Sequence, residues 1–132
     1  LNEARLAHGL SPVRPFDLFR PLAREHAAFM ASEGRLGHTL PGLTSGVPDR
    51  AVSVAHPQAK FYENVAVALN PKDAHALVED SPGHFRNLLC EQCTHATIGV
   101  ALEPVLDRPP RLFVAWELMW FPEGTPHPLP QK

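Results

Sequence analysis

The chain has 132 residues, of which 44% are hydrophobic and 20% charged, and its formal net charge is −2. This length suits one domain with a single core, and the composition is ordinary for a globular protein. The sequence has no cluster of lysine or arginine, which argues against a nucleic-acid partner, and no apolar run reaches the ~18–20 residues that cross a bilayer. We therefore expect no nucleic-acid binding and no transmembrane segment, while the oligomeric state stays open.

The first third of the sequence predicts two helices. Residues 1–10 read as a short helix, and residues 11–15 form a connector broken by prolines. A second helix is expected at roughly 18–33, with Asp17 as its cap. Its apolar side chains recur at three- and four-residue steps, which predicts one buried stripe.

A long loop and a strand follow. Residues 37–57 are rich in Gly, Pro, Ser and Thr without a clear period, and a loop of this length in a small domain is usually functional. Residues 61–69 alternate as a strand, with Glu63 on one face and Asn64 on the other.

The second half predicts helices followed by strands. One helix opens at Pro71 and another at Pro82, where Ser81 takes the N-cap position. After a turn, strands are expected at 96–102 and 111–121. The last strand is apolar on both faces, so it should be central and covered on both sides. The pattern predicts an α+β fold with helices on both sides of a small sheet, in a single domain over 1–122 followed by a proline-rich tail over 123–132.

Several motifs taken in order resemble the bacterial branch of the CAP superfamily. These proteins carry SCP-like extracellular domains and are relatives of cysteine-rich secretory proteins, antigen 5 and pathogenesis-related proteins. The resemblance covers residues 2 to about 122, and it rests on six motifs and a closing apolar strand. The motifs are N-E-A-R-L-A-H-G-L (2–10), A-R-E-H-A-A-F-M-A (23–31), G-R-L-G-H (34–38), Y-E-N-V (62–65), S-P-G-H-F-R-N-L-L (81–89) and I-G-V-A-L (98–102).

The resemblance implies a three-layer α-β-α sandwich with a small, mostly antiparallel central sheet and a central cleft. Family members line this cleft with two histidines and one or two glutamates, which can hold a divalent ion, often zinc. The matching positions here are His38, Glu63 and His84. The second glutamate of the eukaryotic members should lie a few residues before His84, where this sequence has Glu79 and Asp80, but Val78 replaces the aromatic landmark before them and leaves both unaligned. Most members are secreted and several bind sterols or other lipids, but membership implies no common enzymatic activity.

The residue types themselves allow two interpretations of these three positions. Imidazole and carboxylate groups suit Zn²⁺ and would leave a position for water, although no pair shows the short spacing of a helical zinc motif. Alternatively, His38, Glu63 and His84 hydrogen-bond one another and order the 37–57 loop. Asn64 is expected to satisfy loop backbone groups beside the cleft.

Two further polar residues fall in apolar surroundings. Glu117 shares a face of the last strand with Ala115 and Met119, so it should be buried and needs a partner or a proton. It either completes the cleft as the missing acid or serves as a structural acceptor. His26 lies on the apolar stripe of the second helix, where a core histidine with its hydrogen bonds satisfied is the simpler interpretation.

The pair Cys90 and Cys93 allows several readings. Thr94 stands where haem c attachment needs a histidine, and a zinc ribbon needs a second cysteine pair. A redox-active pair normally opens a helix in a thioredoxin-like unit, which this sequence lacks. A local disulfide is favoured, and it suits an exported protein.

The leading functional hypothesis is binding in an extracellular or cell-envelope protein. The cleft and the 37–57 loop would hold a divalent cation, a small or lipid-like ligand, or both. The chain begins at Leu1 without methionine or signal peptide, so we expect an upstream segment that was either cleaved or is not included in this sequence. One rival is a metal-assisted hydrolase with Glu63 or Glu117 as general base. Another is a protein-interaction module with a vestigial cleft, in which the proline-rich tail does the docking.

Overall fold

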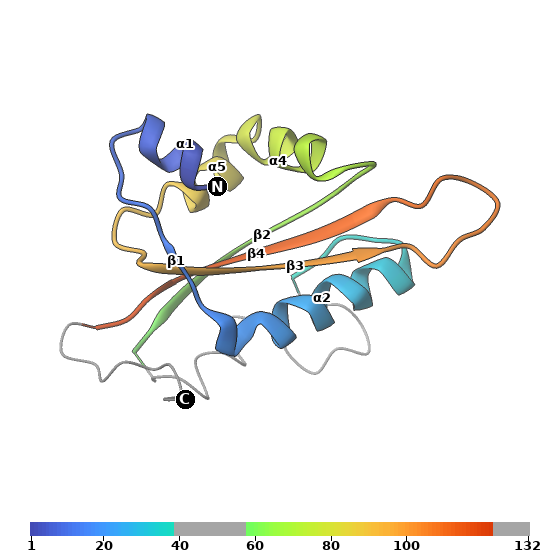
Figure 1. Ribbon diagram of the computed structural model, residues 1–132, viewed down its shortest axis with the longest axis horizontal. Helices are drawn as coiled ribbons and strands as arrows, with labels where there is room; N and C mark the ends of the chain where they lie inside the picture. The colour runs from blue at the N-terminus through green and yellow to red at the C-terminus, as the bar shows by residue number, and fades with distance from the viewer. Residues whose placement is uncertain (39–57, 123–132) are drawn as a thin grey trace.

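The protein is built in three layers around a mixed sheet. The computed structural model describes residues 1–38 and 58–122, so most of the predicted 37–57 loop and the tail from 123 onward lie outside the described residues. Helices α1 (Asn2–Ala7), α4 (Pro71–Glu79) and α5 (Pro82–Leu88) lie on one side of the sheet, and α2 (Arg20–Glu33) lies on the other (Figure 1). This arrangement confirms the predicted α+β sandwich.

The sheet has four described strands in the order β1-β3-β4-β2. They are β1 (Arg14–Pro15), β2 (Lys60–Ala68), β3 (His95–Leu102) and β4 (Leu112–Trp120). Strand β4 pairs antiparallel with both β3 and β2, whereas β1 pairs parallel with β3. The apolar character of β4 on both faces therefore predicted its central position correctly.

Strand β1 was missed because it is two residues long and contains a proline. Its hydrogen bonds to β3 come from the residues on either side of Pro15. Arg14 donates its N–H to the Thr94 carbonyl and Phe16 donates to the Ala96 carbonyl, both at 2.8 Å. In a strand, alternate residues present their N–H groups to the same neighbour, so the absent N–H of Pro15 falls on the side that needs no bond.

Hydrophobic cores fill the space on both faces of the sheet. The core between the sheet and α1, α4 and α5 includes Trp116 and Leu118 of β4, and the core against α2 includes Phe113 and Ala115. Successive residues of β4 thus enter opposite cores, as the alternation of side chains along a strand requires.

The second helix begins differently from the sequence expectation. Asp17 does not cap α2 but opens a 3-10 turn, η1 (Asp17–Phe19), and pairs with Arg20. Phe19 then occupies the N-cap position of α2, without a side-chain cap. The helix ends at Gly34, whose φ of 69° is a left-handed conformation that glycine adopts at little cost.

Two polar residues anchor α1, and one of them, Arg5, is fully buried. The Asn2 side chain bonds both backbone groups of Val13, and the guanidinium of Arg5, which has no exposed surface, donates to the carbonyls of Ser11, Leu88, Cys90 and Cys93. These contacts tie α1 to the turn between α5 and β3.

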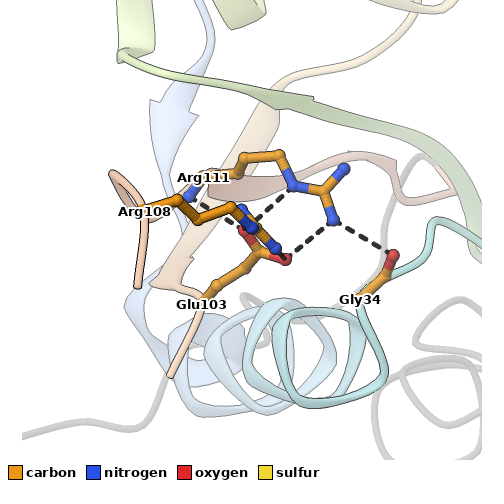
Figure 2. Close-up of polar contacts among 4 residues, drawn as sticks. All are labelled: Gly34, Glu103, Arg108 and Arg111. Carbon is orange, nitrogen blue, oxygen red and sulfur yellow. Dashed lines mark hydrogen bonds and ion pairs between the residues drawn. The ribbon is translucent and has the colours of Figure 1, made fainter. Parts of the chain in front are cut away.

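A second polar cluster ties the β3–β4 hairpin to the end of α2. Glu103 accepts from the guanidinium groups of Arg108 and Arg111 and from the Arg111 backbone N–H (Figure 2). Arg111 also donates to the carbonyl of Gly34 at 3.3 Å, so one side chain links the hairpin to the helix terminus. The two arginines hold the pKa of Glu103 well below its usual range.

Candidate functional site

A layer of buried polar side chains lies between α2 and the strands β2 and β4. Glu63 of β2 is the register partner of Glu117 on β4, so the two carboxyl groups lie side by side on the face toward α2. His26 of α2 approaches them, with its Nε2 3.7 Å from Oε1 of Glu63. The side chains of His26 and Glu63 are only 1% and 2% exposed, and Glu117 is fully buried. The predicted burial of Glu117 is therefore confirmed.

His38 closes this layer from the solvent side. Its Nδ1 lies 2.6 Å from Oε1 of Glu63, while its own side chain is 58% exposed. The hydrogen bond to Glu63 raises the pKa of His38, and this effect outweighs partial burial. Burial alone would raise the pKa of Glu63, but the bond to His38, the adjacent Glu117 and the nearby histidines lower it overall. The favoured state is an imidazolium paired with a carboxylate.

Glu117 is the proton-bearing member of the carboxyl pair. Its pKa lies well above the usual range because the group is buried and because Glu63 beside it is negatively charged. Among the described residues neither oxygen of Glu117 has a hydrogen-bond partner, and Oε2 of Glu63 has none either. Two carboxyl groups this close do not ionise together, so a protonated Glu117 beside an ionised Glu63 accounts for the arrangement.

Asn64 belongs to the opposite face of β2. Its amide donates to the His84 carbonyl at 2.8 Å, and its oxygen accepts from Asn87 at 3.0 Å. Asn87 also approaches the Glu63 carbonyl at 3.3 Å. Asn64 therefore satisfies backbone beside the site, although the backbone belongs to α5 rather than to the loop. No sequence pattern singles out Asn87, which lies one helical turn after His84.

A cavity of about 260 Å³ runs along the outer edge of β2. Val65 and Val67 face α2 whereas Ala66 faces α4, so a cavity lined by all three wraps around this edge strand. Its other lining residues come from the segment after α2 and from the α4–α5 layer: Leu36, Leu77, Val78, Ser81 and His84. The wall is mainly apolar, and the His84 ring makes no hydrogen bond with a described residue.

The three positions implied by the family resemblance are not brought together as one cluster. His38 and Glu63 are paired on the α2 side, whereas His84 belongs to α5 in the opposite layer and lines the cavity. Within 1–38 and 58–122, no group of three or more His, Cys, Asp or Glu side chains is placed to hold a metal. Zinc needs at least three protein ligands, so these side chains as placed fit it only in part, and zinc binding stays a prediction.

The other singled-out residues have structural contacts. Cys90 and Cys93 form a disulfide in the turn that Arg5 binds. His26 is a core histidine, bonded through Nε2 to the Gly37 carbonyl at 2.8 Å, but it also contributes positive potential to Glu63. Sequence reasoning missed this second role, because only the packing of α2 on β2 and β4 brings the two residues together.

Comparison with known proteins agrees with this architecture. The family model described as "CAP: Cysteine-rich secretory protein family" matches residues 1–114, so the chain belongs to the CAP family. No curated protein sequence matches the chain. The predicted resemblance to bacterial SCP-like domains is confirmed, and the described helices include none long and apolar enough to cross a membrane.

Two solved bacterial structures share the fold. An outer surface protein from Borrelia burgdorferi superposes with a TM-score of 0.68 at 19% identity, over 90% of this chain and 85% of that protein. An extracellular protein containing an SCP domain from Bacillus anthracis gives a TM-score of 0.66 at 23% identity, over 91% of this chain. The match covers 37% of the Bacillus protein, so the chain spans little more than a third of that protein's length.

Proposed function

We propose that this chain is an exported binding domain whose cleft at the edge of β2 holds a small, largely apolar or lipid-like ligand. The observation that carries the proposal is the cavity of about 260 Å³ between the two helical layers. Six of its eight lining residues are apolar, with the Ser81 and His84 side chains as polar groups. Ligand sites commonly combine an apolar wall with a few polar groups that orient the ligand.

The cavity size limits the ligand. Pockets for drug-sized molecules have volumes of roughly 300–1,000 Å³, so a cavity slightly below that range suits one short acyl chain or a single ring. His84 is positioned to bind a polar end group, because its ring has no other hydrogen-bond partner among the described residues. Export is supported by the Cys90–Cys93 disulfide, since such bonds persist in oxidising compartments. The names of the two structural neighbours, an outer surface protein and an extracellular protein, agree with it.

Binding is favoured over hydrolysis by the position of the acids. A general base must reach the substrate or a water beside it. Glu63 and Glu117 are almost completely buried, and neither is among the residues that line the cavity. The carboxylate of Glu63 is also engaged by His38.

The test is calorimetric titration with decanoate, comparing wild type with Leu77→Arg. Leu77 lines the cavity and is 53% exposed, so an arginine there should not unfold α4. It would place a charge against the apolar ligand and weaken binding at least tenfold, equivalent to about 1.4 kcal/mol. Leu6→Arg is the matched control, since Leu6 is 58% exposed on α1 and does not line the cavity.

Saturable heat in wild type and in the Leu6 variant, but not in the Leu77 variant, would support the cleft as the binding site. Absence of binding in wild type, or equal affinity in all three proteins, would refute it. Replacing decanoate by zinc chloride in the same titration tests the cation separately. Zinc binding that is lost in His38→Ala would support a metal role for the His38–Glu63 pair. Absence of zinc binding in wild type would refute that role.

A further inference from the structure

The opposite edge of the sheet carries a second feature, which the cleft does not involve. Strand β1 covers only the first two residues of β3, pairing Arg14 with His95 and Pro15 with Ala96. The chain then leaves the sheet to form η1 and α2 (Figure 1). Within the described residues, β3 from Thr97 to Leu102 is paired on one side only, with β4.

The direction of the free backbone groups follows from the bonds already made. The Ala96 carbonyl accepts from β1, whereas the Glu103 N–H donates to Arg111 at the end of β4. Since backbone groups alternate in direction along a strand, Ile98, Val100 and Leu102 direct their N–H and C=O groups to the outer edge. No described strand pairs with these groups, so they form a ladder immediately beyond β1 that is open in the described part of the chain.

The same three residues also form an exposed apolar row. Ile98, Val100 and Leu102 are 40%, 46% and 58% exposed, although they alternate with residues covered by α2. Their side chains lie on the face opposite α2, beside the buried Trp116, Val114 and Leu112 of β4. An exposed branched aliphatic row on an unpaired edge is the feature that strand addition uses, because backbone bonds give affinity and alternate side chains give specificity.

An arginine-walled groove lies at the β1 end of this edge. Its volume is about 410 Å³, and it is lined by Ala96, Thr97 and Ile98 of β3 together with Arg14, Arg20 and Arg24. Asp17 is the one acidic residue among its lining residues and pairs with Arg20, so three arginines against one aspartate leave two positive charges. This local excess stands out on a chain with a net charge of −2.

From this juxtaposition we propose that the β3 edge binds an extended peptide segment of another protein by strand addition, with an acidic residue of the peptide seated between Arg14 and Arg24. The free ladder would pair with the peptide backbone, and the aliphatic row would contact alternate apolar side chains. Neither Arg14 nor Arg24 has a carboxylate partner among the described residues, so both are available to the acid.

A second copy of this chain fits the edge less well. Pairing two β3 edges about a two-fold axis centred on Val100 would bring Ile98 of one copy against Leu102 of the other. Each arginine groove would then face the Leu102–Glu103 end of its partner. Glu103 is already bonded to Arg108 and Arg111, so the groove would meet no free acid. The charge of the groove therefore favours an acidic peptide.

The experiment measures fluorescence anisotropy of a labelled eight-residue peptide of alternating valine and threonine that ends in two aspartates. We expect saturable binding to wild type, at least tenfold weaker binding to Arg14→Glu/Arg24→Glu, and at least tenfold weaker binding when alternate peptide nitrogens are methylated. The N-methylated peptide tests the backbone ladder without altering the protein. Arg86→Glu is the matched charge control, because Arg86 is exposed on α5 and lies outside the groove.

Binding of the aspartate peptide to wild type and to the Arg86 variant, with both expected losses, would support the proposal. No binding to wild type, equal binding of a peptide ending in two lysines, or insensitivity to N-methylation would overturn it. Light scattering on the protein without peptide tests the oligomeric state separately. A dimer that dissociates in Val100→Lys would show that the edge binds a second copy, and it would overturn the peptide proposal. Leu77→Arg, which disrupts the proposed cleft, should leave peptide binding unchanged.

Discussion

Glu117 is the residue whose chemistry the fold alters most. It sits in the central strand, fully buried, beside a carboxylate that is already paired with His38. In the unfolded chain Glu117 ionises freely, whereas in the folded protein its pKa is raised by burial and by Glu63. The folded state thus retains a proton that the unfolded state loses as the pH rises, and stability must fall over that range.

Replacing the Glu117 carboxyl group by an amide should abolish this loss of stability at high pH. We expect Glu117→Gln to raise the free energy of unfolding by about 1–3 kcal/mol at pH 8, because a neutral amide of the same shape can donate to Glu63. At pH 4.5 the difference should nearly vanish, since the native carboxyl group is then protonated in the fold. Urea denaturation at the two pH values measures both quantities.

Glu91→Gln provides the comparison, because Glu91 is an exposed residue of the turn before β3. It should change stability by less than about 0.5 kcal/mol at either pH. A Glu117→Gln variant that is destabilised equally at both pH values would show that the buried carboxyl group is ionised and needed as an acceptor.

The packing of α2 on β3 depends on one glycine. A Cβ on Gly99 would lie 2.1 Å from the Ala23 carbonyl oxygen and 2.5 Å from the Arg24 nitrogen. Both atoms belong to the helix backbone, so no side-chain rotation relieves the clash, and the helix would have to move off the sheet. The same approach holds His26 near Glu63, so the polar layer depends on it as well.

Gly99→Ala should therefore destabilise the protein by about 3 kcal/mol or more, at the upper end of the overpacking range. Gly83→Ala is the matched control, because Gly83 lies in α5 and an added Cβ there meets nothing within 4 Å. Alanine is the better helix former, so this control should be stabilised by up to about 1 kcal/mol. Thermal unfolding followed by circular dichroism distinguishes the two. Equal melting temperatures for Gly99→Ala and wild type would contradict the close contact between α2 and β3.

Across the whole molecule, periodicity predicted the elements better than it predicted their contacts. The alternation of β4 correctly predicted that Glu117 is buried, and the two-sided apolar pattern of β4 predicted its central position. The two-residue β1 has no period to detect, and its partner lies some eighty residues later in the chain.

The candidate site was predicted only in part, because the sequence pattern predicts the strands and helices but not which of their side chains meet. The pairing of His38 with Glu63 agrees with the interpretation that these residues hydrogen-bond one another. His84 lies elsewhere because α5 packs on the face of β2 that carries Asn64, and a spacing of about twenty residues does not specify a face. His26 joins Glu63 only through the close approach of α2 to the sheet, which sequence alone does not reveal.

Taken together, the shifted groups predict a stability maximum at weakly acidic pH. Glu63 and Glu103 have lowered pKa values, so their contribution is complete above about 4.5 and is lost as the pH falls through the folded pKa values. His38 has a raised pKa, so its contribution is complete below about 6.5 and is lost as the pH rises through its folded pKa. Glu117 also has a raised pKa, so its contribution is complete below about 4.5 and is lost as the pH rises from there toward its folded pKa.

The melting temperature should therefore be highest at about pH 5 and decline toward both pH 3 and pH 9. Each side of the profile can be assigned with one variant. Glu103→Gln removes the carboxylate that binds Arg108 and Arg111, so it should lower stability at neutral pH and flatten the acid side. His38→Gln should flatten the alkaline side, because the remaining amide does not titrate. A profile that rises steadily to pH 9 in wild type would show that neither His38 nor Glu117 carries its proton in the folded protein.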